Sequence, residues 1–121
     1  MVIDFHTHVF PEKIAKSTIE ALAKNSTSIP YTDGTVQGLI DAMERADADI
    51  SIALPVLTKP TQFESVAKFV ISVNQSFENK TGRKIISFAG MHPACEDIDG
   101  KMQYLQSQGI KGVKIHPDYQ Q

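Results

Sequence analysis

The chain alternates between short apolar segments and longer segments with helical spacing. β-Branched and apolar residues form four runs that predict strands, at residues 2–6, 49–56, 84–93 and 110–117. Between these runs, apolar residues recur at intervals of three and four, which is typical of helices with one buried face. Strands joined by helices form right-handed crossovers and a parallel sheet. The order of elements therefore predicts an α/β fold.

Several positions mark the ends of the expected helices. Thr35 suits an N-cap, and Gly109 suits a C-terminal stop. Residues 61–64 have the Thr-x-x-Glu form of a capping box. The helix predicted after this box has a buried stripe that runs to Phe77 and is apolar except for Asn74.

The outer strands have one polar face each. Alternation along the first strand groups Asp4, His6 and His8 on one face, and Ile3 and Phe5 on the other. Alternation along the last strand groups Gly112, Lys114 and His116, opposite Val113 and Ile115. An open sheet covered by helices on both faces would have nearly continuous apolar strands.

A barrel interior that carries a reaction centre explains the polar faces better. A whole (β/α)8 barrel needs about 250 residues, whereas this chain has 121. We therefore expect half of a TIM-type (β/α)8 barrel, with about four strands and outer helices, formed by residues 1–121 as a single domain. Inside it, Asp4 and Lys114 are expected to form an ion pair; a carbamylated lysine bridging metals is the alternative for Lys114.

The composition narrows the function classes. Twelve Lys and Arg residues and 14 Asp and Glu residues are interspersed, with a net charge of −2. Because the two signs of charge are interspersed, the sequence has no basic patch that would indicate binding to nucleic acid or to a membrane surface. The sequence shows no signal-peptide pattern and no apolar run of the ~20 residues that a membrane span needs. The single cysteine, Cys95, fits a reducing cytoplasm.

All four histidines lie at the carboxyl ends of predicted strands, where parallel α/β folds place their sites. A His-x-His pair at a strand end puts His6 and His8 on one side of the sheet, about 6.5–7 Å apart at the backbone. The rings can converge on one ion at the ~2.0–2.1 Å of zinc–imidazole bonds. Alternatively, they are surface histidines that only make hydrogen bonds.

His92 and His116 are each followed by a proline, which biases them toward extended geometry at the end of a strand. They are better candidates for contacts with substrate than for metal ligands, and each has the alternative of a hydrogen-bonded loop histidine. Cys95 has the pattern of a soft metal ligand or, more simply, of a small buried residue.

Three segments, "DFHTHVFPEKIA", "GMHP" and "GVKIHPDYQ", resemble the amidohydrolase superfamily, in the subgroup of aminocarboxymuconate-semialdehyde decarboxylase and related metal-dependent hydrolases. The resemblance implies a (β/α)8 barrel with a metal site at the carboxyl ends of its strands. It implies that His6 and His8 bind the metal and that His116 lies near the site, in a position whose role varies among subgroups. We expect His116 to be a catalytic residue, and His92 and Tyr119 to contact a small-molecule substrate. The implied cofactor is a divalent ion, zinc or else manganese, and the implied reaction is attack of an activated water on a carbonyl-type centre.

Such enzymes take further metal ligands, and an acid–base aspartate, from strands that have no counterpart here. The sequence is therefore expected to be the N-terminal half of such a hydrolase and to be inactive alone. A non-hydrolytic decarboxylase of the same superfamily is an alternative. So are a phosphoesterase of the polymerase-and-histidinol-phosphatase type and a catalytically silent half-barrel. Open sheet edges predict a homodimer or larger assembly.

Overall fold

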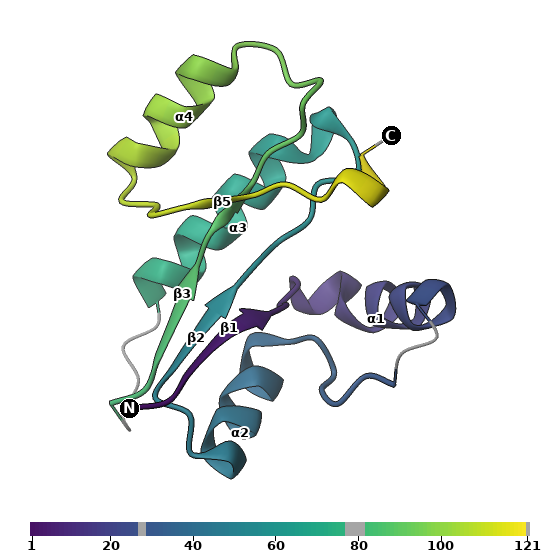
Figure 1. The fold of residues 1–121 in the computed structure, drawn as a ribbon, viewed down its shortest axis with the longest axis vertical. Helices are drawn as coiled ribbons and strands as arrows, with labels where there is room; N and C mark the ends of the chain where they lie inside the picture. Colours follow the sequence, from purple (N-terminus) through teal and green to yellow (C-terminus); the bar gives the residue numbers. More distant parts are fainter. Residues whose placement is uncertain (27–28, 77–81, 121) are drawn as a thin grey trace.

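In a computed structural model of the chain, residues 1–26, 29–76 and 82–120 are described. The elements follow the expected alternation (Figure 1). In chain order they are β1 (Ile3–Thr7), α1 (Glu12–Ser26), α2 (Val36–Ala46), β2 (Ile50–Ala53), the 3-10 turn η1 (Pro60–Gln62), α3 (Phe63–Ser76), β3 (Lys84–Ser87), β4 (Ala89–Gly90), α4 (Ile98–Ser107), β5 (Val113–Lys114) and the 3-10 turn η2 (Pro117–Tyr119).

All strand pairs are parallel, and each strand pairs with a neighbour in the sequence. β2 lies between β1 and β3, and β4 pairs with β5. The predicted strand at 84–93 is present as two short strands. The first, β3, pairs with β2, and the Phe88 amide that follows it donates to the Ala53 carbonyl. The next amide, that of Ala89, donates instead to the carbonyl of Gly112, just before β5. The predicted α/β class with parallel strands is confirmed.

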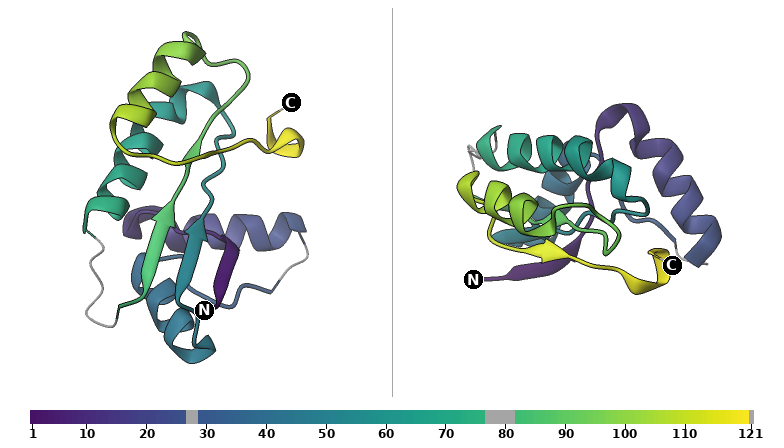
Figure 2. Two further views of the ribbon diagram at one scale, coloured as in Figure 1. Left: turned by 60° about the vertical axis from the view of Figure 1, so that its left-hand side comes forward. Right: turned by 90° about the horizontal axis from the view of Figure 1, so that it is seen from above.

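The helices lie together on one side of the strands (Figure 2). Two clusters of buried apolar side chains fill the space between the layers, one centred on α3, β4 and α4 and the other on α2, β2 and β3. Phe69 of α3 packs against both clusters and so connects them. Within the described residues, every helix is too short or too polar to cross a membrane.

The predicted helix ends are partly confirmed. The Thr35 hydroxyl caps α2 by accepting from the Gly38 amide at 2.9 Å. Gly109 follows α4 with a φ of +79°, a conformation that glycine adopts without a steric cost.

The capping box predicted at residues 61–64 is wrong. Pro60 begins a 3-10 turn, and α3 starts only at Phe63. The Gln62 side chain takes the capping role instead, because its Oε1 accepts from the amides of Thr58 and Lys59 at 2.8 and 3.1 Å. Phe77, at the end of the predicted stripe, lies outside the described residues.

A register shift in β1 changes the predicted faces of this strand. Asp4 pairs with Ser51 but Thr7 pairs with Ala53, so β1 has one extra residue. Ala53 belongs to the core under the helices, and Asp4 therefore lies on the helix side. The Phe5 ring instead meets the Phe88 ring edge-on, with 6.0 Å between centroids. The prediction that Asp4 shares a face with His6 and His8 and points into the barrel interior is therefore wrong.

Asn74 is the polar exception in the stripe of α3, and its side chain explains why. Its Nδ2 donates to the Ser87 carbonyl at 2.9 Å, and its Oδ1 accepts from the Ser87 amide at 2.7 Å. These two bonds satisfy the backbone of the last residue of β3, where the strand changes partner. An apolar side chain at position 74 would leave both groups without their hydrogen bonds.

Replacing Asn74 by alanine should therefore lower the free energy of unfolding by about 1–3 kcal/mol, the cost of leaving buried polar groups unpaired. Urea denaturation followed by circular dichroism measures this loss. Gln75→Ala is the matched control, because Gln75 is an exposed neighbour on the same helix. Equal stabilities of the two variants would contradict the role of Asn74.

Candidate metal centre

His8 follows β1, and its orientation is set by the end of β2. Its Nδ1 lies 2.8 Å from the Leu54 carbonyl oxygen. A carbonyl only accepts, so Nδ1 carries the proton and Nε2 of the neutral ring keeps its lone pair. Histidines that bind metals usually donate their second ring nitrogen in this way. The environment of His8 therefore fits a metal ligand that binds through Nε2.

The surroundings of His8 also favour its neutral form. Burial lowers the pKa of His8 from its usual 6.5, and the bond to Leu54 offsets part of this effect. The positive charges of His6, Lys114 and His116 lower the pKa further. These three residues come from the two ends of the described chain, so the fold gathers them around His8.

His6 completes a close pair of rings. Its ring centroid is 5.0 Å from that of His8, with an interplanar angle of 65°. The His6 amide donates to Asp4 Oδ1 at 3.1 Å, across the register shift of β1. His6 and His8 flank Thr7, whose side chain is buried and donates to the Ile52 carbonyl at 2.9 Å. Both rings therefore lie on the face of β1 opposite Thr7, away from the helices.

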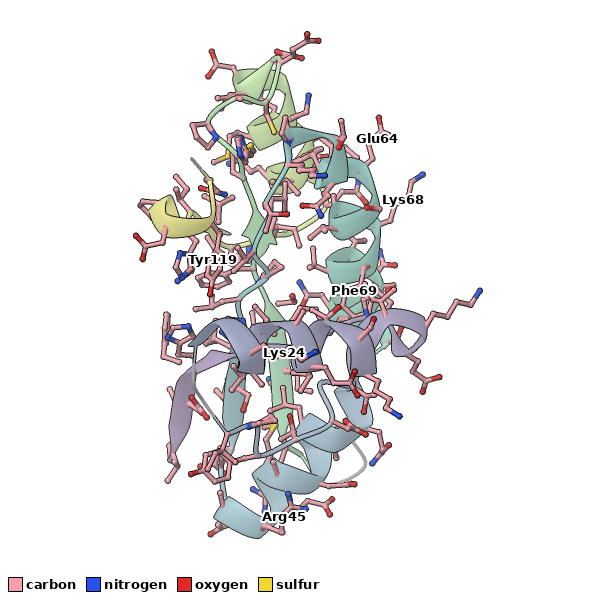
Figure 3. All side chains as sticks on the ribbon, turned by 90° about the vertical axis from the view of Figure 1, so that its right-hand side faces the viewer. Lys24, Arg45, Glu64, Lys68, Phe69 and Tyr119 are labelled. Atoms are coloured by element: carbon pink, nitrogen blue, oxygen red, sulfur yellow. The ribbon has the colours of Figure 1, made fainter. Side chains whose placement is uncertain are left out.

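His116 and Tyr119 lie together at the end of β5. Their rings meet edge-on with 4.5 Å between centroids. His116 Nδ1 is buried and has no hydrogen-bond partner among the described residues. In Figure 3, Tyr119 lies on the opposite side of the molecule from Glu64 and Lys68 of α3. The structure thus places Tyr119 against His116 after β5, and His116 lies near enough to His8 to lower its pKa.

His92 is placed differently from the other histidines. It is buried, its Nδ1 accepts from the Ala94 amide at 3.1 Å, and its carbonyl accepts from the Cys95 amide. Only its Nε2 is left for a substrate. Cys95 is buried in the core beside α3, which fits a small packing residue.

The described residues, 1–26, 29–76 and 82–120, contain no group of three or more His, Cys, Asp or Glu side chains arranged to hold a metal. His6 and His8 are neighbouring rings, and the prediction that they bind a metal stays a prediction. The expected ion pair between Asp4 and Lys114 does not form: the two ion pairs of the described part are Met1 with Asp49 and Arg83 with Asp47. Lys114 instead lies near His8.

Gln120 was missed by the sequence analysis. It is buried, and its Nε2 donates to the carbonyls of Leu57 and Met91 at 2.8 and 2.7 Å. Its Oε1 accepts from the His116 amide at 3.1 Å. One side chain thus joins the segments that follow β2, β4 and β5. A glutamine near the end of the sequence gives no signal of this role.

A cavity of about 530 Å³ lies elsewhere, lined by residues of α4 and of the segment 110–113. Another, of about 340 Å³, lies between α3 and α4. None of the histidines lines either cavity.

Comparisons with known proteins returned no match to a protein-family model, to a curated protein or to a solved structure.

Nuclear magnetic resonance of ¹⁵N-labelled imidazoles should find metal-free His8 as the Nδ1–H tautomer at pH 7, with a protonation midpoint below 6.5. Because the pKa is lower in the folded state than in the unfolded state, the contribution of His8 to stability is complete above pH 6.5. It is lost as the pH falls from 6.5 through the folded-state pKa. A midpoint at or above 6.5, or an Nε2–H tautomer, would contradict this assignment.

Gln120→Leu should destabilise the fold by about 2–4 kcal/mol, because two buried carbonyls and one amide lose their partner. Chemical denaturation measures the loss, with Gln106→Leu as control, because Gln106 is an exposed residue of α4. The Tyr119 ring resonances should also shift in Gln120→Leu, since the turn that carries Tyr119 loses its attachment. Unchanged stability and unchanged spectra would show that Gln120 does not hold these segments.

Proposed function

We propose that this chain carries the metal-binding end of a divalent-metal-dependent hydrolase of the amidohydrolase superfamily. The observation that supports it most directly is the hydrogen bond from His8 Nδ1 to the Leu54 carbonyl, which leaves Nε2 available beside the His6 ring. The motif resemblance of residues 4–15 points to the same pair.

The topology supports a barrel wall as the setting of this site. Each strand lies beside its neighbour in the sequence, and the helices lie on one side (Figure 2). A doubly wound sheet would reverse its strand order and carry helices on both faces. Sequential parallel strands with helices outside are the arrangement of a (β/α)8 barrel, so we interpret the fold as half of such a barrel.

The positions of the histidines and of Tyr119 are compatible with the following roles in binding metal and substrate. His6 and His8 hold a divalent ion, with zinc favoured by two imidazole donors and manganese as the alternative. When bound, such an ion polarises a carbonyl-type substrate and makes water a nucleophile near pH 7. His116 and Tyr119 face a small-molecule substrate at the end of β5, and His92 offers only its Nε2. The free, buried Cys95 fits a reducing compartment such as the cytoplasm.

Zinc titrated into the chain in a calorimeter should bind, and the double variant His6→Ala, His8→Ala should lose this binding. His92→Asn is the matched control, because asparagine can still accept from the Ala94 amide and should leave the binding unchanged. Equal zinc binding by the wild type and the double variant would remove His6 and His8 from the site and contradict the proposed function.

Metal-dependent hydrolysis of ester, lactone and amide substrates by this chain should not exceed background. A hydrolytic metal site needs about three protein ligands and a positioned acid–base group, and the described residues hold no group of three or more His, Cys, Asp or Glu side chains that could bind the metal. Assays with added zinc or manganese test this expectation. Robust turnover that His8→Ala abolishes would show that further strands are dispensable for catalysis and that the assignment of roles by resemblance is wrong.

A further inference from the structure

The register shift of β1 includes the amide of His6, and the Asp4 side chain binds this amide. Asp4 pairs with Ser51 before the shift and Thr7 pairs with Ala53 after it, so β1 has one extra residue. A bulge of this kind leaves a residue without its partners in the ladder. Asp4 Oδ1 accepts from the His6 amide at 3.1 Å, and the carboxylate thus provides a partner for a backbone donor inside the bulge.

The part of β1 after the shift is held by bonds that do not involve Asp4. The Thr7 hydroxyl donates to the Ile52 carbonyl at 2.9 Å, and the Thr7 carbonyl accepts from the Leu54 amide at 2.8 Å. The Leu54 carbonyl in turn accepts from His8 Nδ1 at 2.8 Å. The position of His8 is therefore fixed by β2, independently of the Asp4 carboxylate.

Phe5 shows what the shift changes in the segment before Thr7. Its ring meets the ring of Phe88 edge-on, with 6.0 Å between centroids. The Phe88 ring lies against Gly112, where an added Cβ atom would come within 2.5 Å of it. Regular alternation counted back from Thr7 would turn Phe5 toward the helices and remove this contact, because one residue of slip moves side chains to the other face. The bulge therefore keeps both Phe5 and His6 on the face opposite Thr7.

Asp4 is not placed to bind the ion itself. It lies on the helix side of β1, across the strand from the two rings. It is exposed, and it takes no part in the ion pairs of the described residues. Aspartate side chains commonly bind the backbone amide two residues further along the chain. Asp4 therefore acts on His6 through the backbone.

We propose that Asp4 is a positioning residue of the histidine pair. Its carboxylate stabilises the bulge in β1, and the bulge keeps the His6 ring beside the His8 ring, with 5.0 Å between centroids. Both imidazoles can then approach one ion from the same face. This inference deepens the proposed function, on which it rests, because it assigns the geometry of the metal pair to a side chain that does not touch the metal.

Nuclear magnetic resonance of the metal-free chain tests the positioning. In Asp4→Ala the His6 amide proton should shift upfield, because it loses a charged acceptor, and the contacts between the His6 and His8 rings should weaken. The tautomer of His8 should not change. Asp4→Asn should behave as the wild type does, because its side-chain oxygen still accepts a hydrogen bond. The midpoint of urea unfolding should stay close to that of the wild type in both variants, since Asp4 is exposed.

Zinc titrations followed through the imidazole resonances test the consequence for metal binding. Asp4→Ala should bind zinc at least about tenfold more weakly than the wild type, the lower end of the loss caused by removing an outer-shell partner. Asp4→Asn should bind with nearly wild-type affinity. Asp49→Ala is the matched control, because the exposed Asp49 also binds a backbone amide of this segment, that of Val2 at 2.7 Å, but outside the register shift. It should leave zinc affinity unchanged.

The outcomes separate this inference from the function on which it rests. Equal zinc affinities of Asp4→Ala and the wild type, with loss in the His6→Ala, His8→Ala variant, would overturn the positioning role and leave the metal pair intact. Equal losses in Asp4→Ala and Asp4→Asn would assign the effect to charge, and an equal loss in Asp49→Ala would assign it to general loosening of β1. Either result would overturn the inference. Zinc binding that ignores His6 and His8 would overturn the proposed function, even where Asp4→Ala separates the two rings.

Discussion

The arrangement of this chain's histidines depends on the register shift between Asp4 and Thr7. Before the shift, β1 and β2 pair so that Asp4 lies on the helix side; after it, Thr7 lies there. One extra residue in a strand changes which side chains share a face. Phe5 and the two histidines that flank Thr7 are therefore turned away from the helices. Strict alternation would have grouped Asp4 with both histidines instead.

The end of the sheet is held by side-chain and backbone hydrogen bonds that link distant segments. The Leu54 carbonyl orients His8, and Gln120 joins the segments after β2, β4 and β5. The carboxyl ends of neighbouring parallel strands continue into separate loops. Hydrogen bonds between these loops are needed to hold them at fixed positions relative to one another. Here a buried amide does so, and this explains why a polar residue is tolerated in an apolar environment.

The sequence alone predicts those helix ends that depend only on neighbouring residues. The hydroxyl of Thr35 and the left-handed conformation of Gly109 need only neighbouring residues, and both were predicted correctly. The box at residues 61–64 failed because Pro60 starts a 3-10 turn that shifts the helix start. The break at Phe88 could not be predicted, because it depends on which strand lies on each side. The bulge in β1 and the role of Gln120 likewise depend on partners that are far away in the sequence.

Sequential strand pairing also bears on which segments of the chain open most easily. In the described residues, the two strands of each pair are joined by one helical crossover, and β3 continues directly into β4 of the second sheet. β2 pairs with a strand on both sides, whereas β1 and β5 each pair on one side only in the described residues. Strands with fewer pairing bonds open more easily in local fluctuations. The segments that carry His8 and His116 therefore belong to the parts of the fold that open at the lowest cost in free energy.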